Sequence, residues 1–282
     1  MDIFEEIEPL RAFLKGKRGA LKSIGLVPTM GALHDGHLAL IRASKSENDV
    51  TVSSIYVNPT QFNNQADLDK YPRTREADIK LLQAEGCDVL FVPQNSEMCS
   101  GDQSMSFDFG TLDKVLEGKF RPGHFSGVAL VVSKFFNIVQ PDKAYFGQKD
   151  YQQFQVINRL KVELKFSIKL ESVPIVREKS GLALSSRNQR LTEVDKKNAL
   201  FLYHTLKDAK DQLLRRVPFS KIRKDAEARV KKYDGVKLEY FELANKNTLQ
   251  DLEDVSDYKN GILLMAAFVN DVRLIDNMLL SD

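Results

Sequence analysis

The chain has 282 residues, enough to form two domains with a sizeable core. Its 41 lysine and arginine residues nearly balance its 39 acidic residues, so the net charge of +2 gives no general reason to expect binding to nucleic acid or a membrane. The two cysteines lack metal-type spacing, the opening residues are acidic rather than signal-like, and no apolar run approaches the ~20 residues that span a bilayer. We therefore expect a soluble, cytoplasmic protein.

The first 93 residues alternate predicted helices and strands. Apolar residues recur at helical spacing between Ile3 and Leu14, which predicts an opening amphipathic helix that ends near Gly16 or Gly19. The apolar and β-branched runs predict strands at 24–27, 49–57 and 88–92. Further helices are predicted at 38–44 and at 74–85, the latter with Thr74 as its N-cap.

The pattern from residue 94 to residue 123 is less regular, and regular elements are expected again from residue 126 onward. The sequence from 94 to 176 predicts strands at 104–109, 143–146 and 167–173, a helical turn at 112–116, and helices at 126–139 and 149–161. Strands that alternate with helices through short connections form a mainly parallel sheet with helices on both faces. We therefore predict an α/β domain over residues 1–176.

The character of the sequence changes near residue 177. A polar loop at 178–188 precedes long charged helices at 192–215 and 220–232, and strands are expected at 237–243, 261–269 and 272–275. These elements predict a smaller α+β domain over residues 177–282. The basic-skewed stretch 207–232 is typical of a solvated helix face.

The most informative stretch, residues 27–37, joins a predicted buried strand to a predicted helix. Such turns bind phosphate groups, because the helix N-terminus offers unpaired N–H groups and the positive end of its dipole. Gly31 permits the turn and Gly36 permits close approach of a ligand, while His34 and His37 can each donate a ring N–H to phosphate. Half of a metal site and a purely structural cap are the alternatives.

Two further stretches combine turns with polar side chains. Residues 58–62 follow a strand at the end where open α/β sheets bind ligands, and Gln61 offers both a donor and an acceptor to a small substrate. Residues 119–127 place Arg121 and His124 on a Pro-Gly turn before a helix, where both can hold phosphate. For residues 58–62 the alternative is a turn capped by Gln61. For residues 119–127 the alternative is a plain turn.

Two later stretches add cations. Residues 146–153 form a strand, a glycine turn and a helix, in which Lys149 can bind phosphate and Gln153 lies one helical turn further on the same face. Residues 182–188 place two hydroxyls beside Arg187, a set that can wrap a triphosphate and close over it. For residues 146–153 the alternative is a glycine turn with a surface lysine. For residues 182–188 the alternative is a helix cap. The chain has no P-loop, no GxGxxG fingerprint and no nucleophile elbow.

Together and in this order, the motifs resemble the pantoate–β-alanine ligase family. The matching segments are 28–37, 58–62, 71–74, 120–128, 146–153 and 185–188, and the similarity covers nearly the whole chain. The first and last segments also look like the HIGH and KMSKS signatures of the wider nucleotidyltransferase superfamily.

The resemblance implies an ATP-dependent ligase that works in two half-reactions. Pantoate would first form pantoyl adenylate and release pyrophosphate, and β-alanine would then displace AMP. Magnesium would bridge the triphosphate. The family fold implies a Rossmann-like N-terminal domain, a hinged C-terminal domain that acts as a lid, and a homodimer, with small-molecule substrates rather than nucleic acid or membrane as partners.

The resemblance also assigns roles to residues. His34, His37, Lys149 and Arg187 would be catalytic, with His37 as the family's usual proton donor. The ATP site would comprise Met30, Gly31, Ala32, Leu33, His34, Asp35, Gly36, His37, Gly147, Gln148, Lys149, Asp150, Val176, Leu184, Ser185, Ser186 and Arg187. The substrate site would comprise Asn58, Gln61, Arg121, His124 and Gln153, and Asp78 is a weaker candidate near the magnesium. Leu184 stands where the family commonly has Met, and Gln148 stands where Glu is frequent; both departures are small.

Overall fold

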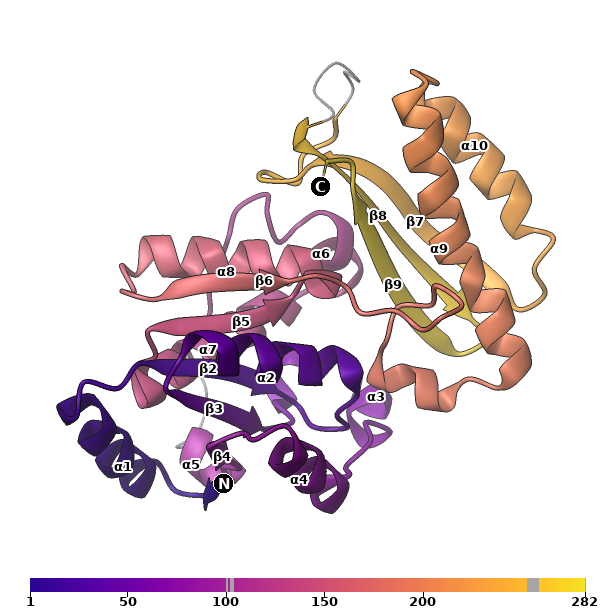
Figure 1. Cartoon of the computed structure of the whole chain (residues 1–282). Helices are drawn as coiled ribbons and strands as arrows, with labels where there is room; N and C mark the ends of the chain where they lie inside the picture. The colour runs from indigo at the N-terminus through magenta and orange to yellow at the C-terminus, as the bar shows by residue number, and fades with distance from the viewer. Residues whose placement is uncertain (100, 102–103, 253–258, 282) are drawn as a thin grey trace. The chain divides into compact units, whose positions relative to one another are not determined.

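The computed structural model describes residues 1–99, 101, 104–252 and 259–281. Their contacts divide the chain into two units (Figure 1). The first comprises Met1–Gln148 and Gln152–Pro174, and the second comprises Lys149–Tyr151 and Ile175–Asp282. Lys149–Tyr151 therefore belong to the second unit, although the residues on either side of them in the sequence belong to the first.

The first unit is built on a parallel sheet of six strands in the order β1-β4-β3-β2-β5-β6. The strands are β1 (Asp2–Phe4), β2 (Ile24–Thr29), β3 (Val50–Ile55), β4 (Val89–Phe91), β5 (Lys143–Gly147) and β6 (Lys169–Val173). The inner strands β2, β3 and β4 are almost wholly buried, as expected for runs of apolar residues covered on both faces. The predicted α/β class with a mainly parallel sheet is confirmed.

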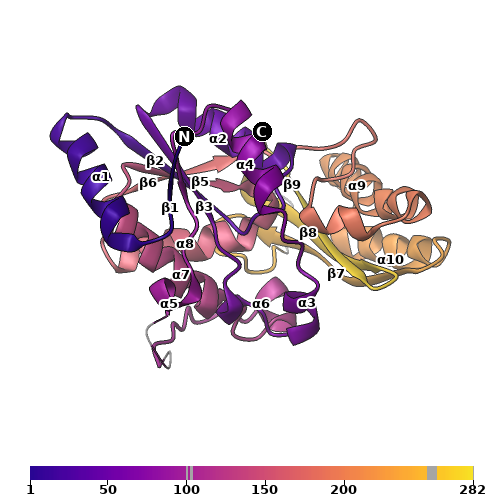
Figure 2. The ribbon, with the colours of Figure 1, turned by 90° about the horizontal axis from the view of Figure 1, so that it is seen from below.

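Helices cover both faces of this sheet (Figure 2). The helices α1 (Ile7–Gly19), α7 (His124–Val139) and α8 (Tyr151–Glu163) share one apolar cluster with the strands, and α2 (Asp35–Glu47) and α4 (Arg75–Ala84) share another. Leu26 belongs to the first cluster and its neighbour Val27 to the second, because successive side chains of a strand point to opposite faces.

The order of the strands creates a switch point between β2 and β5. From β2 the chain continues outward through β3 and β4, whereas β5 and β6 lie on the other side of β2. Ligands of open parallel sheets bind outside the carboxyl ends of the strands at such a point. The loops that follow β2 and β5 are therefore the expected position of a site in this unit.

Three sequence expectations for the first unit were wrong in detail. Residues 2–4 form strand β1, which pairs with β4, so the helix begins at Ile7 and Ile3 lies outside it. Residues 104–109 form no regular element, and the helical turn expected at 112–116 is replaced by α6 (Leu116–Phe120) after a turn. The structure also adds short elements that the sequence did not predict: α3 (Gln65–Asp69), α5 (Asn95–Met98) and the 3-10 turn η1 (Pro59–Gln61).

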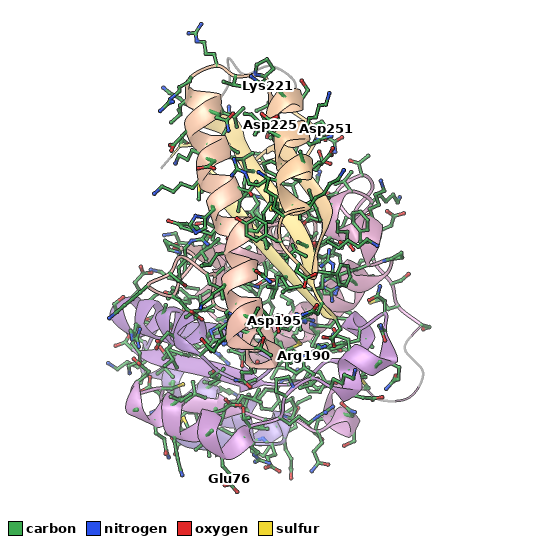
Figure 3. The ribbon with its side chains drawn as sticks, turned by 90° about the vertical axis from the view of Figure 1, so that its right-hand side faces the viewer. Glu76, Arg190, Asp195, Lys221, Asp225 and Asp251 are labelled. Carbon is green, nitrogen blue, oxygen red and sulfur yellow. The ribbon has the colours of Figure 1, made fainter. Side chains whose placement is uncertain are left out.

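The second unit is an antiparallel sheet with two helices on one face (Figure 3). Strands β7 (Val236–Asn245), β8 (Gly261–Val269) and β9 (Val272–Leu279) lie in that order, and α9 (Glu193–Leu214) and α10 (Phe219–Val230) share an apolar cluster with them. Thr192 and Asp195 form a capping box at the start of α9. The predicted α+β character of this part is confirmed. Among the described residues, no helix is both long and apolar enough to cross a membrane.

Candidate functional site

The loop after β2 adopts a strained conformation that an internal carboxylate stabilises. Gly31 and Ala32 both have left-handed backbone angles, with φ of 81° and 49°. Two successive N–H groups, those of Ala32 and Leu33, donate to the two oxygens of Asp78 at 3.0 and 2.8 Å. A turn of this kind forms a concavity that binds an anion. Here the anion is the carboxylate of Asp78 on α4, which is 1% exposed.

Asp78 is further engaged by Thr74. The Thr74 hydroxyl donates to the Asp78 carboxylate and lies 3.2 Å from each oxygen, and Thr74 caps no backbone N–H of α4, although it occupies the predicted N-cap position. The weaker prediction that Asp78 lies near magnesium gains no support from these contacts, because backbone and hydroxyl donors occupy both oxygens. Asp78 instead holds the loop between β2 and α2.

His34 and His37 cap the start of α2. His34 Nδ1 accepts the backbone N–H of Gly36 at 3.1 Å, and His37 Nδ1 accepts the backbone N–H of His34 at 3.4 Å. In each neutral ring the proton therefore resides on Nε2. The ring centroids are 4.1 Å apart, so the two rings lie side by side at the N-terminus of α2. The structural cap is thus real and uses Nδ1 of each ring, while the phosphate role of the two histidines stays a prediction.

A second set of hydrogen bonds fixes Gln61, which is buried at the end of η1. Asn58 Nδ2 donates to Gln61 Oε1 at 3.2 Å, and Gln61 Nε2 donates to Met30 Sδ at 2.9 Å. His124 Nδ1 donates to the Gln61 carbonyl oxygen at 2.8 Å, and Arg121 Nη1 donates to His124 Nε2 at 3.1 Å. Gln61 is therefore held both through its backbone and through its side chain.

Three predicted substrate residues take part in these contacts. Asn58 and His124 are buried, and each uses both of its side-chain polar groups within the protein. Arg121 contacts His124 and lies 3.9 Å from Glu117. These contacts hold the segment that carries Gln61, and the predicted contacts of Asn58, Arg121 and His124 with substrate stay predictions.

The structure also adds a close approach that the sequence did not reveal. A Cβ atom at Gly127 would lie 2.2 Å from the Thr60 carbonyl oxygen, so a glycine is required where α7 meets η1. The Gly127 carbonyl in turn accepts from Asn58 Nδ2 at 3.1 Å.

The turn after β5 carries Gly147 and the 3-10 turn η2 (Gln148–Asp150). The Lys149 side chain is mostly buried, and its Nζ lies 4.0 Å from Asp150 Oδ1. Gln152 is also buried and bonds the backbone of Leu112, Val115 and Glu117, so it has a structural role. Gln153 is half-buried, and its predicted contact with substrate stays a prediction.

The remaining predicted residues lie in the loop that opens the second unit. The Leu184 N–H donates to the Val176 carbonyl oxygen at 3.0 Å, which joins two residues of the predicted ATP site. Ser185 Oγ accepts the Arg187 N–H at 3.3 Å and caps the 3-10 turn η3 (Ser186–Arg190). The helix-cap alternative therefore describes Ser185, while Arg187 lies in the first turn of η3.

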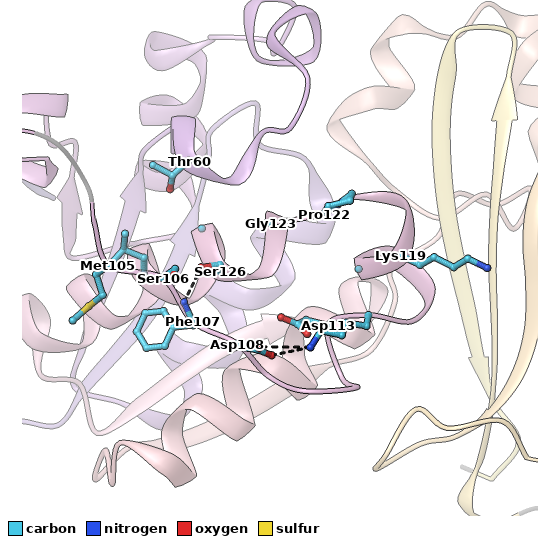
Figure 4. A pocket seen from close by; sticks show the side chains of 14 residues that line it. Thr60, Met105, Ser106, Phe107, Asp108, Asp113, Lys119, Pro122, Gly123 and Ser126 are labelled. Atoms are coloured by element: carbon cyan, nitrogen blue, oxygen red, sulfur yellow. Dashed lines mark hydrogen bonds and ion pairs between the residues drawn. The ribbon is translucent and has the colours of Figure 1, made fainter.

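A pocket of about 710 Å³ lies in the first unit, between residues 105–108, α6 and the start of α7 (Figure 4). Its lining includes Thr60, Phe107, Asp108, Lys119 and Gly127. None of His34, His37 and Gln61 lines it, although Thr60 and Gly127 belong to the matching segments 58–62 and 120–128. Among the residues that the structure describes, no cluster of three or more His, Cys, Asp or Glu side chains can hold a metal ion.

Comparison with known proteins identifies the family. A family model described as pantoate-beta-alanine ligase matches residues 2–279. A pantothenate synthetase of Cytophaga hutchinsonii is 46% identical over 275 residues, which is 97% of each chain, and one of Thermotoga petrophila is 44% identical over 99% of this chain and 100% of its own.

Solved structures agree with the relatives. Pantothenate synthetase from Thermus thermophilus superposes with a TM-score of 0.93 at 37% identity, with all of both chains covered. Pantoate-beta-alanine ligase from Francisella tularensis, complexed with beta-gamma ATP and beta-alanine, gives a TM-score of 0.83 at 37% identity, over 99% of this chain and 98% of that one. The chain therefore belongs to the pantoate–β-alanine ligase family.

Proposed function

We propose that this chain condenses pantoate with β-alanine at the expense of ATP, forming pantothenate, AMP and pyrophosphate through a pantoyl-adenylate intermediate. The observation that carries this proposal is the connected set of hydrogen bonds at the carboxyl end of β2. It joins the histidine pair at the start of α2 to the loop held by Asp78, and it fixes Gln61 against Met30. A phosphate-binding helix start thus adjoins an amide suited to a small hydroxy acid.

In the first half-reaction a pantoate carboxylate oxygen attacks the α-phosphorus of ATP, and the bond between that phosphorus and the bridging oxygen to the β-phosphate breaks. Negative charge develops on the departing pyrophosphate. The Nε2–H groups of His34 and His37 and the N-terminus of α2 stabilise that charge, because they are fixed donors that need no reorganisation. No nucleophile from the protein is required.

In the second half-reaction the uncharged amine of β-alanine attacks the acyl carbon of the adenylate. The amide bond forms, the bond to the AMP oxygen breaks, and the amine proton is lost to solvent or phosphate. The protein contributes by holding the reactants together, an effect that can amount to about 7–11 kcal/mol of the barrier. Gln61 and Gln153 are proposed to hold pantoate during both steps.

Lys149 and Arg187 are proposed to bind the triphosphate. Lys149 supplies a compact charge on the turn after β5, and Arg187 supplies a planar fork preceded by the Ser185 and Ser186 hydroxyls. Gly147, Gln148, Asp150 and Val176 would contribute to the nucleoside site, and Leu184 would belong to the phosphate loop with Arg187.

Magnesium fits this site as a substrate-borne ion. Mg²⁺ is usually held by substrate phosphates, waters and one or two carboxylates rather than by an all-protein cage. The described residues offer no such cage, and the Asp78 carboxylate is occupied by N–H donors. We therefore propose that the ion would arrive as MgATP, where it would neutralise phosphate charge. We also propose, from the family resemblance, that the chain acts as a cytoplasmic homodimer.

Product analysis tests the proposal. Purified protein with MgATP, pantoate and β-alanine should form pantothenate, AMP and pyrophosphate in equal amounts, measured by mass spectrometry and coupled pyrophosphate detection. A stable adenylate that ignores β-alanine would identify a nucleotidyltransferase instead, and ATP binding without turnover would identify a nucleotide-binding module. Activity only with another acid would refute the assignment of pantoate.

A further inference from the structure

Two neighbouring residues of β9, Asp276 and Asn277, are polar and buried, although no motif singles them out. Asn277 Nδ2 donates to the carbonyl oxygen of Lys149 at 2.9 Å. These residues are 128 positions apart in the chain. The last strand of the second unit thus holds the backbone of the proposed catalytic lysine.

Asp276 binds a different segment through Arg177. The guanidinium forms a two-pronged ion pair with Asp276, with Nη1–Oδ2 at 2.7 Å and Nη2–Oδ1 at 2.8 Å. Arg177 Nη1 also donates to the Gly181 carbonyl oxygen at 3.0 Å, and the guanidinium lies 4.8 Å from the centroid of the Tyr203 ring. The turn that follows Arg177 is therefore fixed at both ends.

The same turn is packed so closely that it requires a glycine. Gly181 has a φ of 101°, and a Cβ atom there would lie 2.2 Å from the Tyr203 ring. Residues Arg177 and Ala183 pair as an antiparallel bridge, and Asn188 Nδ2 donates to the Ala183 carbonyl oxygen at 3.0 Å. Contacts therefore continue from Asp276 through the turn to the η3 segment that carries Arg187.

We infer that Asp276 and Asn277 are positioning residues that fix the backbone of Lys149 and the loop of Arg187 relative to one another. The inference rests on the proposed function, in which both cations bind one triphosphate. Two charges that serve a single transition state must keep their spacing, since a displacement of about 1 Å can cost 100-fold in rate. Anchoring both segments to adjacent residues of one strand meets that requirement.

The chemistry of Asp276 and Asn277 indicates that they position other segments rather than add to the stability of the fold. A buried ion pair contributes little net stability relative to apolar residues of the same volume. A bidentate Arg–carboxylate pair, however, fixes the direction of the groups that it joins. An amide donor to a main-chain carbonyl acts in the same way on the peptide of Lys149.

A double-mutant cycle tests the inference. Asn277→Leu removes the donor at similar volume and is combined with Lys149→Gln. For each variant we would measure kcat and KM for pantoate-dependent exchange of pyrophosphate into ATP. The melting temperature is measured alongside. Asn198→Leu is the matched control, because Asn198 in the same unit also donates Nδ2 to a backbone carbonyl, that of Asp234, at 3.0 Å.

We expect Asn277→Leu alone to lower kcat about tenfold, and to have less than a twofold effect when Lys149 is already Gln, because it acts through that lysine. Asn198→Leu should change neither kcat nor KM. An equal fold-change in both backgrounds, or no change in either, overturns the inference. If Asn277→Leu does not fold, Asn277→Ser takes its place in the cycle under the same criteria. Absence of exchange by the unmodified protein would instead refute the proposed function itself.

Discussion

The Asp78 carboxylate accepts the backbone N–H of Leu33 at 2.8 Å, across 45 residues of sequence. Together with the bond to Ala32, this contact gives the loop between β2 and α2 an internal anion in the position that a phosphate takes in other turns of this type. Asp78 therefore holds the loop in its left-handed conformation without a ligand. The N-terminus of α2 is capped by His34 and His37 instead.

Asp78→Asn should therefore impair both stability and activity. The amide offers one acceptor where the loop uses two, and loss of bonds to a buried charge costs about 1.5–3 kcal/mol. We expect urea denaturation to report a loss of about that size in the free energy of unfolding, and kcat to fall, while the magnesium concentration for half-maximal rate is unchanged. Glu76→Gln, at an exposed position on the same helix (Figure 3), is the control. A large shift in the magnesium requirement would instead identify Asp78 as a ligand.

His37→Ala should lower kcat far more than it raises KM for ATP. The Nε2–H group is proposed to stabilise charge that develops only in the transition state, and loss of one such donor typically costs about 100- to 1,000-fold in kcat. Steady-state kinetics with ATP varied at saturating pantoate measure the split. An unchanged kcat would reduce His37 to the helix cap that its Nδ1 forms with His34.

His124→Ala should act on pantoate rather than on ATP. His124 donates to the Gln61 carbonyl oxygen at 2.8 Å and contacts Arg121 through its other nitrogen. Its removal frees the segment that carries Gln61, so we expect KM for pantoate to rise about tenfold, while KM for ATP changes less than threefold. A rise in KM for ATP alone would restore the phosphate role first expected of His124.

Cys87 should resist alkylation in the folded protein. Burial raises the pKa of its thiol to about 11, and only the thiolate reacts. At pH 7.5 the thiolate fraction is below about one in a thousand, and the side chain is almost wholly covered. Mass spectrometry after treatment with iodoacetamide should show Cys87 modified only in denaturant. Rapid labelling of native protein would indicate local opening at β4.

The sheet of the first unit could be predicted because buried parallel strands are continuous apolar runs. The strands predicted near 24–27, 49–57, 88–92 and 143–146 are all confirmed. Ile3 was assigned to the wrong element because a strand of three residues has no periodicity of its own, and Ile3 also fits the helical spacing of Ile7. Residues 104–109 alternate like a strand but pair with no strand in the part of the chain that the structure describes.

The motif residues of the site were identifiable locally, whereas their supports were not. His34, His37 and Lys149 lie on turns whose sequence indicates phosphate binding, and this interpretation stays a prediction. The contacts of His124 with Gln61 and of Asn277 with Lys149 span 63 and 128 residues. No local pattern reveals such pairs, so the sequence predicted a ligand for His124 without showing its contact with Gln61, and it left Asn277 without a role.

The central claim is that pantoate is activated as an adenylate before the amine reacts. The most direct measurement is exchange of labelled pyrophosphate into ATP, with pantoate and magnesium present and β-alanine omitted. We predict exchange that depends on pantoate, because the first half-reaction is reversible and needs no amine. Exchange that occurs only after β-alanine is added would contradict a free-standing adenylation step.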